Sequence, residues 1–331
     1  MRYSALFPTR RCPRNCVYCG AKKVQSQEMS IDDWIRATYH LYDFGVVFHT
    51  FLGNELLMLG DNLIKLYQSL QGRQDYAVYS SFPEPLYSQY RQKIVNAKAY
   101  NVSAGIDLLD NSHGSIGEKS LSGLSALKWF KEQGIPDVHG TITLHKASLP
   151  YAIQIADILS SHGIAMAFNT IHWNIDGQYD FFADKRQIEE LLFTKDDLPN
   201  MKRVAKVLEE GIKTGKYNAI NPPEYFDAWL DGGYMLQGGC TKPYLLGVDS
   251  DGSLRLCGYR KGNIFPKYSV FDLGTKISKD DYLEIWTEER RNCKNCFWIY
   301  YIVAEMTGDI YGRTAADDVL RYHNNKPYLS I

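Results

Sequence analysis

Apolar runs of strand length alternate with helix-patterned stretches over the first half of the chain. Residues 3–8 form the first run, and residues 31–42 carry a helical pattern that includes Trp34, Ile35 and Leu41. Further strand candidates are "VVFHTFLG", "YAVYSSF", "NVSAGIDLL", "VHGTITLH" and "IAMAFNTIHW", separated by helical stretches that end at or near Lys98, Gly134 and Gly163. Because strands that alternate with helices usually form a parallel sheet, the sequence predicts an α/β fold.

Seven cysteines divide into a tight trio and a spread quartet. Cys12, Cys16 and Cys19 lie in "CPRNCVYCG" at C-x3-C-x2-C spacing, directly after the first strand candidate. A disulfide framework is not expected in a chain of this size, and a structural zinc site would need a distant fourth ligand. An iron–sulfur cube suits three thiolates better, because one iron then stays open for a substrate or cofactor.

This trio, with Tyr18 just before its third cysteine, resembles the signature of radical S-adenosylmethionine (SAM) enzymes. The resemblance implies a [4Fe-4S] cluster whose open iron chelates SAM and whose electron cleaves SAM to a 5'-deoxyadenosyl radical. It also implies the family's partial (β/α)6 barrel, a TIM-like array with the chemistry at the carboxyl ends of its strands. Tyr18 is then assigned to the adenine, although an aromatic residue that only packs the cluster loop would fit as well.

"GNE", at Gly53, Asn54 and Glu55 after the second strand candidate, resembles the family's GGE motif. The glycine would let the backbone approach the methionyl amino group of SAM, and the carboxylate would balance its charge. The middle residue departs from the usual glycine, and a Gly-Asn-Glu triplet taken alone is more often a plain turn.

Polar residues also follow the other strand candidates. "VSAGID" resembles the family's Ser-x-x-Asp strand end and makes Ser103 the expected contact for SAM, with a sheet serine and a solvated aspartate as the alternative. The SAM-binding residues expected at strand ends, beyond the GNE motif, are Ser80 (or Ser81), Ser103, Asp107 and Asn169 (with Thr170).

The cysteine quartet consists of Cys240, Cys257, Cys293 and Cys296. "CTKPYLLGVDSDGSLRLCG" reads as two short strands around an Asp-Gly turn, and "CKNC" follows a helical segment. The arrangement resembles a twitch domain, the shortened SPASM extension, which implies that the four thiolates hold an auxiliary [4Fe-4S] cluster. A zinc ribbon is the alternative. The expected domains are a barrel at 1–200, a helical connection at 201–235 and the twitch domain with its tail at 236–331.

An auxiliary cluster saturated by four thiolates would move electrons, which points to a net oxidation of the substrate. The segment "FNTIHWNIDGQYDFF" after the sixth strand candidate could cover the mouth of the barrel. Its candidates for substrate contact are His172, Trp173, Asp176 and Tyr179, although residues of these types in such a segment are more often structural. No catalytic acid or base is identified from the sequence.

Composition narrows the partners. A net charge of -1 argues against nucleic acid, and the absence of a long apolar run or a secretory signal predicts a cytoplasmic protein with no membrane partner. The resemblance favours modification of a ribosomally made peptide, including splicease-type chemistry, with an external flavodoxin- or ferredoxin-type reductant and a separate peptide-recognition protein. The alternatives are a twitch-type dehydrogenase that oxidises a small alcohol or sugar, and an iron–sulfur electron-transfer protein.

Overall fold

A curved, mostly parallel sheet forms the centre of the computed structural model, which describes residues 2–20, 27–174, 181–230, 243, 245–255 and 268–291. The strands follow the order β6-β5-β4-β3-β2-β1-β7-β8. The parallel strands expected from the sequence are all present: β1 (Tyr3–Leu6), β2 (Phe48–Phe51), β3 (Asp75–Tyr79), β4 (Asn101–Gly105), β5 (Asp137–Leu144) and β6 (Ala165–Thr170). The α/β prediction is confirmed.

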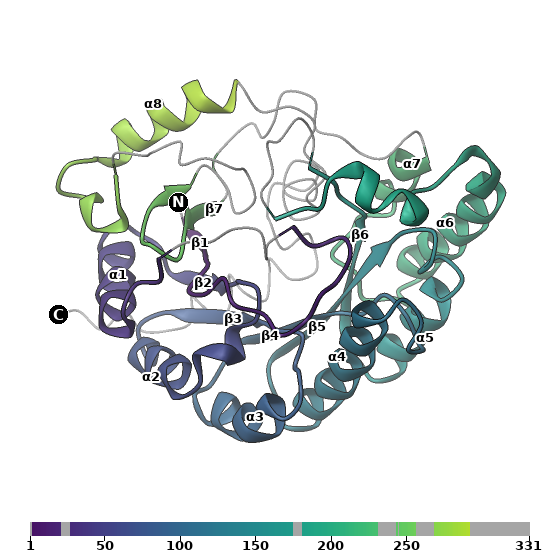
Figure 1. Ribbon diagram of the computed structural model, residues 1–331, viewed down its shortest axis with the longest axis horizontal. Coiled ribbons are helices and arrows are strands. Elements are labelled where there is room, and N and C mark those ends of the chain that lie inside the picture. Colours follow the sequence, from purple (N-terminus) through teal and green to yellow (C-terminus); the bar gives the residue numbers. More distant parts are fainter. Residues whose placement is uncertain are drawn as a thin grey trace.

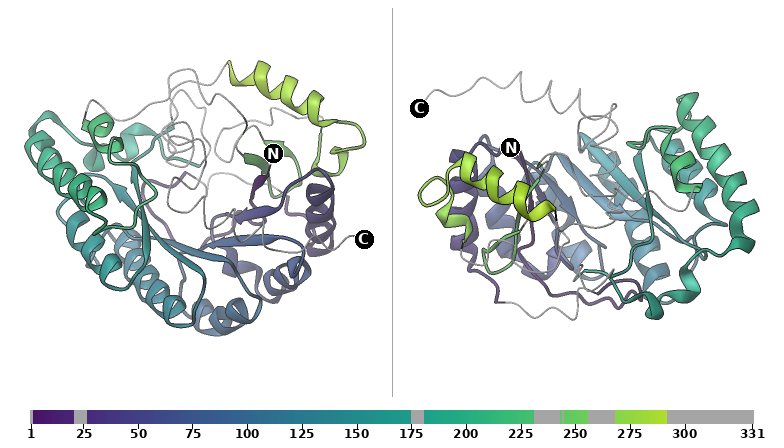
Figure 2. Two further views of the ribbon diagram at one scale, coloured as in Figure 1. Left: turned by 180° about the vertical axis from the view of Figure 1, so that it is seen from behind. Right: turned by 90° about the horizontal axis from the view of Figure 1, so that it is seen from above.

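Helices cover the convex side of this sheet, as Figures 1 and 2 show. They are α1 (Ile31–Asp43), α2 (Asp61–Leu70), α3 (Leu86–Asn96), α4 (Ser115–Glu132), α5 (Ala152–Ser161) and α6 (Leu198–Lys213), with the shorter α7 (Tyr225–Leu230) beside α6. The helix α2 was not singled out by the sequence pattern. No helix in the described part of the chain is both long enough and apolar enough to cross a membrane.

The first helix shows how local sequence sets these elements. Ser30 precedes α1, and its hydroxyl accepts a hydrogen bond from the backbone N–H of Asp33, which caps the helix. Trp34, Thr38 and Leu41 recur at helical spacing and are buried, so one face of α1 packs inward. The apolar stripe predicted at residues 31–42 is therefore the face that attaches α1 to the sheet.

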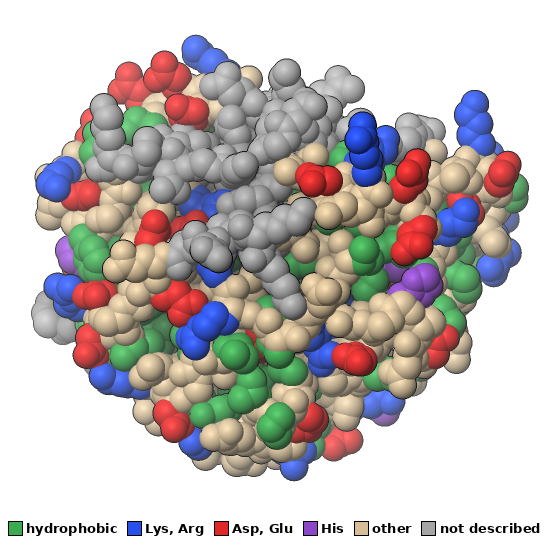
Figure 3. Space-filling model, viewed as in Figure 1, with side chains coloured by type: hydrophobic (Ala, Val, Ile, Leu, Met, Phe, Trp, Pro, Cys, Tyr) green, Lys and Arg blue, Asp and Glu red, His purple; other side chains and the backbone are tan. Residues whose placement is uncertain are grey.

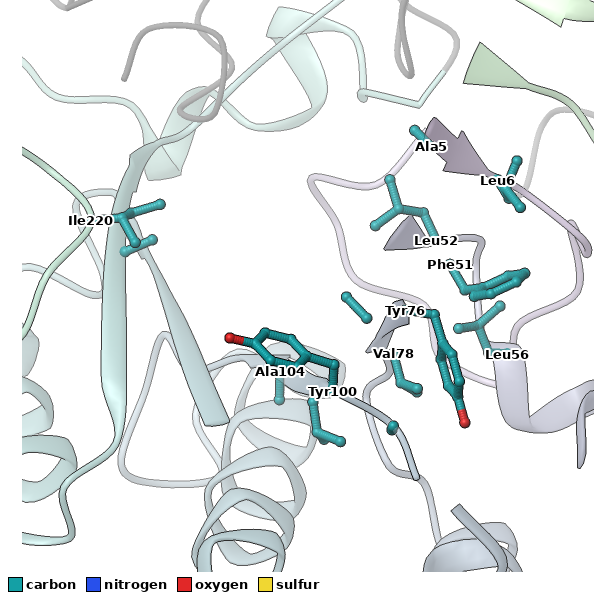
Figure 4. Close-up of a cluster of buried hydrophobic side chains, with 14 of the residues drawn as sticks. Ala5, Leu6, Phe51, Leu52, Leu56, Tyr76, Val78, Tyr100, Ala104 and Ile220 are labelled. Carbon is teal, nitrogen blue, oxygen red and sulfur yellow. The ribbon is translucent and has the colours of Figure 1, made fainter. Parts of the chain in front are cut away.

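The two faces of the sheet differ in polarity. Leu6, Phe51, Val78, Val102 and Val138 are neighbours in register and form an apolar row under the helices. Figure 4 shows part of this core. Side chains alternate along a strand, so the opposite, concave face carries polar residues. Those residues include Ser103, His139, Thr141, Thr143 and Asn169.

Close approach of helices to the sheet depends on small residues. A Cβ atom added to Gly123 of α4 would lie 3.0 Å from the Cβ atom of Ala104 on β4. A Cβ atom added to Gly140 of β5 would lie 2.7 Å from Leu159 of α5. These glycines let α4 and α5 pack directly against the strands that carry the polar concave face.

The hairpin expected between residues 240 and 258 is present but does not stand apart from the barrel. β7 (Leu245–Val248) pairs in parallel with β1, and β8 (Leu254–Arg255) returns antiparallel to β7 around Asp251 and Gly252. The sheet is therefore longer at its β1 edge than the six strands expected. The helical segment before "CKNC" is α8 (Lys279–Arg290), whereas Cys240, Cys257, Cys293 and Cys296 lie outside the described residues.

A buried ionic network joins this hairpin to the N-terminal cysteine loop. The Arg10 Nε donates to Asp249 Oδ1 at 2.9 Å, and Arg255 pairs with the other carboxylate oxygen. Both guanidinium groups lie over the ring of Phe181, that of Arg10 at 4.1 Å. One carboxylate thus neutralises part of two buried positive charges, and it does so between segments far apart in sequence.

The substitution Asp249→Asn should lower the free energy of unfolding by about 3–5 kcal/mol, because it removes a buried carboxylate that pairs with two buried guanidinium groups. Denaturant unfolding followed by circular dichroism measures the change. Asp251→Asn, in the exposed turn of the same hairpin, is the matched control and should leave stability nearly unchanged. Equal effects of the two substitutions would show that the network contributes nothing specific.

Candidate functional site

The cysteine loop follows β1 and is held by backbone contacts. The N–H of Cys19 donates to the carbonyl of Cys16 at 3.0 Å, and the N–H of Gly20 donates to the carbonyl of Phe181 at 2.9 Å. The N–H of Arg14 points at the Cys12 sulfur at 3.4 Å. None of the three cysteines forms a disulfide with another described residue, and Cys19 is exposed.

The three thiols surround one pocket of about 250 Å³ at the carboxyl edge of the sheet. The other walls come from the loop after β2, the end of β3, α4 and the segment that begins at Phe181. The lining residues are Cys12, Arg14, Cys16, Tyr18, Cys19, Gly53, Asn54, Ser81, Lys119, Phe181 and Phe182. The expected cysteine trio, Tyr18 and the first two residues of the GNE motif thus meet in one place.

Gly53 is required by its conformation. Its φ of +144° is one that residues with a side chain rarely adopt, and an added Cβ atom would lie 2.9 Å from the carbonyl oxygen of Thr9. Asn54 follows and donates its amide to the carbonyl of Arg10. The other end of that amide, Oδ1, is buried and has no hydrogen-bond partner among the residues that the structure describes. An acceptor is therefore left at the pocket wall.

Glu55 does not line the pocket but supports its wall. Both carboxylate oxygens are buried: Oε1 accepts from the Ser80 hydroxyl at 2.6 Å, and Oε2 accepts from the Ser81 N–H at 2.9 Å and from the Ser81 hydroxyl at 2.6 Å. Oε1 also accepts from the N–H of Leu57. Glu55 and Ser80, both expected to contact SAM, are therefore bound to each other, and Ser81 is the serine that reaches the pocket.

Asp107 lies beneath the pocket and binds three groups. Its Oδ2 accepts from the Tyr18 hydroxyl at 2.6 Å and from the Lys119 Nζ at 2.7 Å, and its Oδ1 accepts from the N–H of Thr143 at 2.9 Å. Burial alone would raise the pKa of Asp107, but the Lys119 ammonium overrides it and holds that pKa below its usual value. The carboxylate is therefore ionised and orients Tyr18 and Lys119.

Ser103 and Asn169 lie outside the pocket lining. The Ser103 hydroxyl is fully buried and donates to Asn101 Oδ1 at 2.9 Å, while Asn169 Oδ1 lies 3.1 Å from His172 Nε2. His172 stacks on Phe182 at 4.7 Å between ring centroids, and burial lowers its pKa to about 3, so it is neutral at physiological pH. The structure thus places His172 behind the pocket wall.

Several lining residues were not expected from the sequence, notably Arg14, Lys119, Phe181 and Phe182. Arg14 is held by the hydroxyl groups of Ser81 and Ser122 at 3.0 and 2.6 Å. A lysine inside a helix pattern carries no sign of facing a pocket, whereas the two phenylalanines belong to the segment expected to cover the barrel mouth. Asp176 and Tyr179 of that segment lie outside the described residues.

The pocket residues fit both groups that the cysteine motif implies. Burial raises the pKa of the Cys12 thiol to about 11 and also raises the pKa of Cys16, so metal binding would have to displace protons from them. In the described part of the chain, no three His, Cys, Asp or Glu side chains converge on one metal ion. An iron–sulfur cube, in contrast, binds each thiolate at a different iron. Its cysteine ligands therefore surround a pocket and do not converge on one point. The Lys119 ammonium matches the carboxylate of SAM, and the Asn54 oxygen matches the ammonium of SAM.

No protein-family model matches the chain, and no curated protein matches it in sequence. Solved structures do match. Streptococcus suis SuiB bound to S-adenosylmethionine superposes with a TM-score of 0.63 at 14% identity, over 87% of this chain and 67% of that one. SuiB bound to precursor peptide SuiA superposes with a TM-score of 0.60 at 16% identity, over 82% of this chain and 64% of that one.

Native anSMEcpe with bound AdoMet and Cp18Cys peptide gives a TM-score of 0.54 at 14% identity, over 98% of this chain and 99% of that one. The chain has the fold of radical SAM partial barrels. Identities this low show the fold alone, and the chain spans less than two thirds of SuiB in its peptide-bound structure. In this radical SAM-type barrel, the cysteine pocket lies at the strand ends where the chemistry was expected.

The pH dependence of stability tests the role of Asp107. Asp107→Asn should cost about 3 kcal/mol at pH 7, because the buried Lys119 ammonium loses its counter-charge. The folded-state pKa of Asp107 is lowered, so its contribution is complete above the unfolded-state pKa of about 3.9 and is lost as the pH falls through the folded-state pKa. Urea unfolding from pH 7 to pH 3 measures the free energy of unfolding of both proteins. The difference between wild type and Asp107→Asn should narrow only below about pH 4.

Asp196→Asn serves as the control, since Asp196 is exposed and makes no side-chain hydrogen bond or ion pair with another described residue, so it should give nearly the wild-type curve. An Asp107→Asn deficit that stays constant across the whole pH range would contradict the assignment.

Proposed function

We propose that this chain is a radical SAM enzyme that modifies a peptide. The observation that carries the proposal is one pocket in which three cysteine thiols meet the Lys119 side chain and a buried amide oxygen without a hydrogen-bond partner among the described residues. Cys12, Cys16 and Cys19 would hold a [4Fe-4S] cluster there. When bound, this cluster supplies the electron that cleaves SAM to a 5'-deoxyadenosyl radical.

The residues of the chain bind and orient SAM in this proposal. The Asn54 Oδ1 atom accepts from the methionyl ammonium, and Lys119, held by Asp107, pairs with the carboxylate. Gly53 allows the backbone to approach, and Phe181 and Phe182 exclude water from the same pocket. Tyr18 lines the same pocket with its hydroxyl bound to Asp107, and its ring would contact the adenine.

Peptide modification is favoured because matching structures hold peptides: SuiB is bound to precursor peptide SuiA in one, and anSMEcpe holds the Cp18Cys peptide in another. We further propose that Cys240, Cys257, Cys293 and Cys296 hold an auxiliary [4Fe-4S] cluster in a twitch domain over 236–331. That cluster would move electrons from the substrate. A flavodoxin- or ferredoxin-type reductant and a separate peptide-recognition protein complete the proposed partners.

Replacement of the two cysteine groups separates their roles. Anaerobically reconstituted wild type should bind about eight irons, two cubes of four each. Changing the quartet to alanine should remove about half of the iron, and dithionite-driven formation of 5'-deoxyadenosine should persist while product formation stops. Cys16→Ala should abolish 5'-deoxyadenosine, because the cube would lose one of three anchors. Iron analysis and chromatography provide the measurements.

Full iron content in the quartet variant would refute the auxiliary cluster, and 5'-deoxyadenosine from Cys16→Ala would refute the SAM cluster. Substrates deuterated at single positions test the substrate class. Deuterium transfer to 5'-deoxyadenosine from peptides supports the proposal, whereas transfer only from a sugar or alcohol contradicts it.

Binding of SAM tests Lys119 without reference to turnover. Lys119→Met should weaken SAM binding about tenfold or more, because a charge-assisted hydrogen bond contributes roughly 1.5–3 kcal/mol. Lys128→Met, on the same helix but outside the pocket lining, should bind SAM like the wild type. Anaerobic equilibrium dialysis measures both. Unchanged affinity in Lys119→Met would exclude its contact with the carboxylate.

A further inference from the structure

A second, larger pocket of about 520 Å³ lies beyond the carboxyl end of β6. Its walls come from the end of β6, the short 3-10 helices after it, and the helices α6 and α7. Its volume lies within the range of roughly 300–1,000 Å³ found for ligand sites. This pocket beyond β6 is therefore large enough to hold more than one side chain of a bound ligand.

Most of the lining is aromatic or aliphatic. Trp229 of α7 is 2% exposed and packs edge-on against Phe193 at 5.6 Å between ring centroids. Leu192, Leu198, Met201 and Leu230 continue this surface. Such a wall is fixed by core packing and offers an apolar group a preformed site.

The charges of the lining are both positive. Lys185 and Lys195 are exposed, and neither ammonium has a carboxylate of the described residues within ion-pair distance. The Lys185 ammonium lies over the Trp173 ring at 5.3 Å. Among the described residues, no aspartate or glutamate belongs to the lining, so an acidic ligand is favoured over a basic one.

The two pockets share structural elements. The segment from residue 181 onward lines the cysteine pocket with Phe181 and Phe182 and the second pocket with Lys185 and Lys195. A small buried cluster around Ile171 and Leu191 also packs against Cys16, Tyr18 and Trp173. The two pockets are therefore built in part from the same segment and the same buried cluster.

We propose that the second pocket binds an apolar residue of the substrate peptide together with an adjacent acidic residue, away from the residue that reacts. This inference rests on the proposed function. Trp173 and Trp229 line the same pocket as the two exposed lysines, so an apolar side chain in the pocket would lie close to the positive charges. Specificity would then come from an Asp or Glu next to a large apolar residue.

Fluorescence anisotropy with the full chain tests this inference without SAM or reductant. Three fluorescein-labelled peptides serve as probes: one with alternating Glu and Trp separated by Ser, one with Lys in place of Glu, and one with Ser in place of Trp. The Glu/Trp peptide should bind at least about tenfold more tightly than the other two, and added salt should weaken it.

The double variant Lys185→Glu/Lys195→Glu should weaken the Glu/Trp peptide by roughly tenfold, because two attractive charges become repulsive. Lys206→Glu, an exposed change on α6 outside the lining, is the matched control and should bind within about twofold of the wild type. Circular dichroism confirms that all variants fold.

Equal binding of the Lys/Trp or Glu/Ser peptide, or unchanged affinity in the double variant, would overturn the inference. So would free indole-3-acetate binding as tightly as the Glu/Trp peptide, because the occupant would then be a small acid. Peptide binding without any 5'-deoxyadenosine formation would instead leave this pocket intact and remove the proposed chemistry.

Discussion

The buried carboxylate of Asp107 holds the cysteine loop, the barrel and α4 in one arrangement. It accepts hydrogen bonds from Tyr18 in the loop, from Lys119 on α4 and from the N–H of Thr143 on β5. Because a buried charge needs a counter-charge and several donors, these partners can hardly move independently. The shape of the cysteine pocket, and the position of its one lysine, follow from this constraint.

A second buried carboxylate, Asp249, acts in the same way on the other side of the loop. It pairs with Arg10 near the first cysteine and with Arg255 on β8, and Phe181 lies against both guanidinium groups. The segment from Phe181 to Lys195 then links this network to the second pocket. The segment from Phe181 onward thus lines both pockets. Figure 3 shows acidic and basic side chains scattered over one face of the molecule.

Much of the barrel could be predicted because apolar strands and amphipathic helices carry local periodicity. Strand positions from β1 to β6 agree with the apolar runs, and the Asp-Gly turn of the hairpin follows from turn chemistry. The pairing of β7 with β1 could not be predicted, since register between distant strands depends on which edges are free after folding. The helix α2 was not predicted, although Gly60 caps its start and Gly72, with a φ of +77°, follows its end.

The candidate site divides in the same way. The sequence by itself determined the cysteine spacing, the glycine at position 53 and the strand ends that carry Asn54 and Asp107, because spacing and backbone conformation are local properties. Tertiary structure decided that Glu55 is occupied by Ser80 and Ser81, that Ser103 is buried beside Asn101, and that Lys119 faces the thiols. Burial and hydrogen-bond partners come from segments distant in sequence, so only the folded chain shows which polar groups are left free to bind.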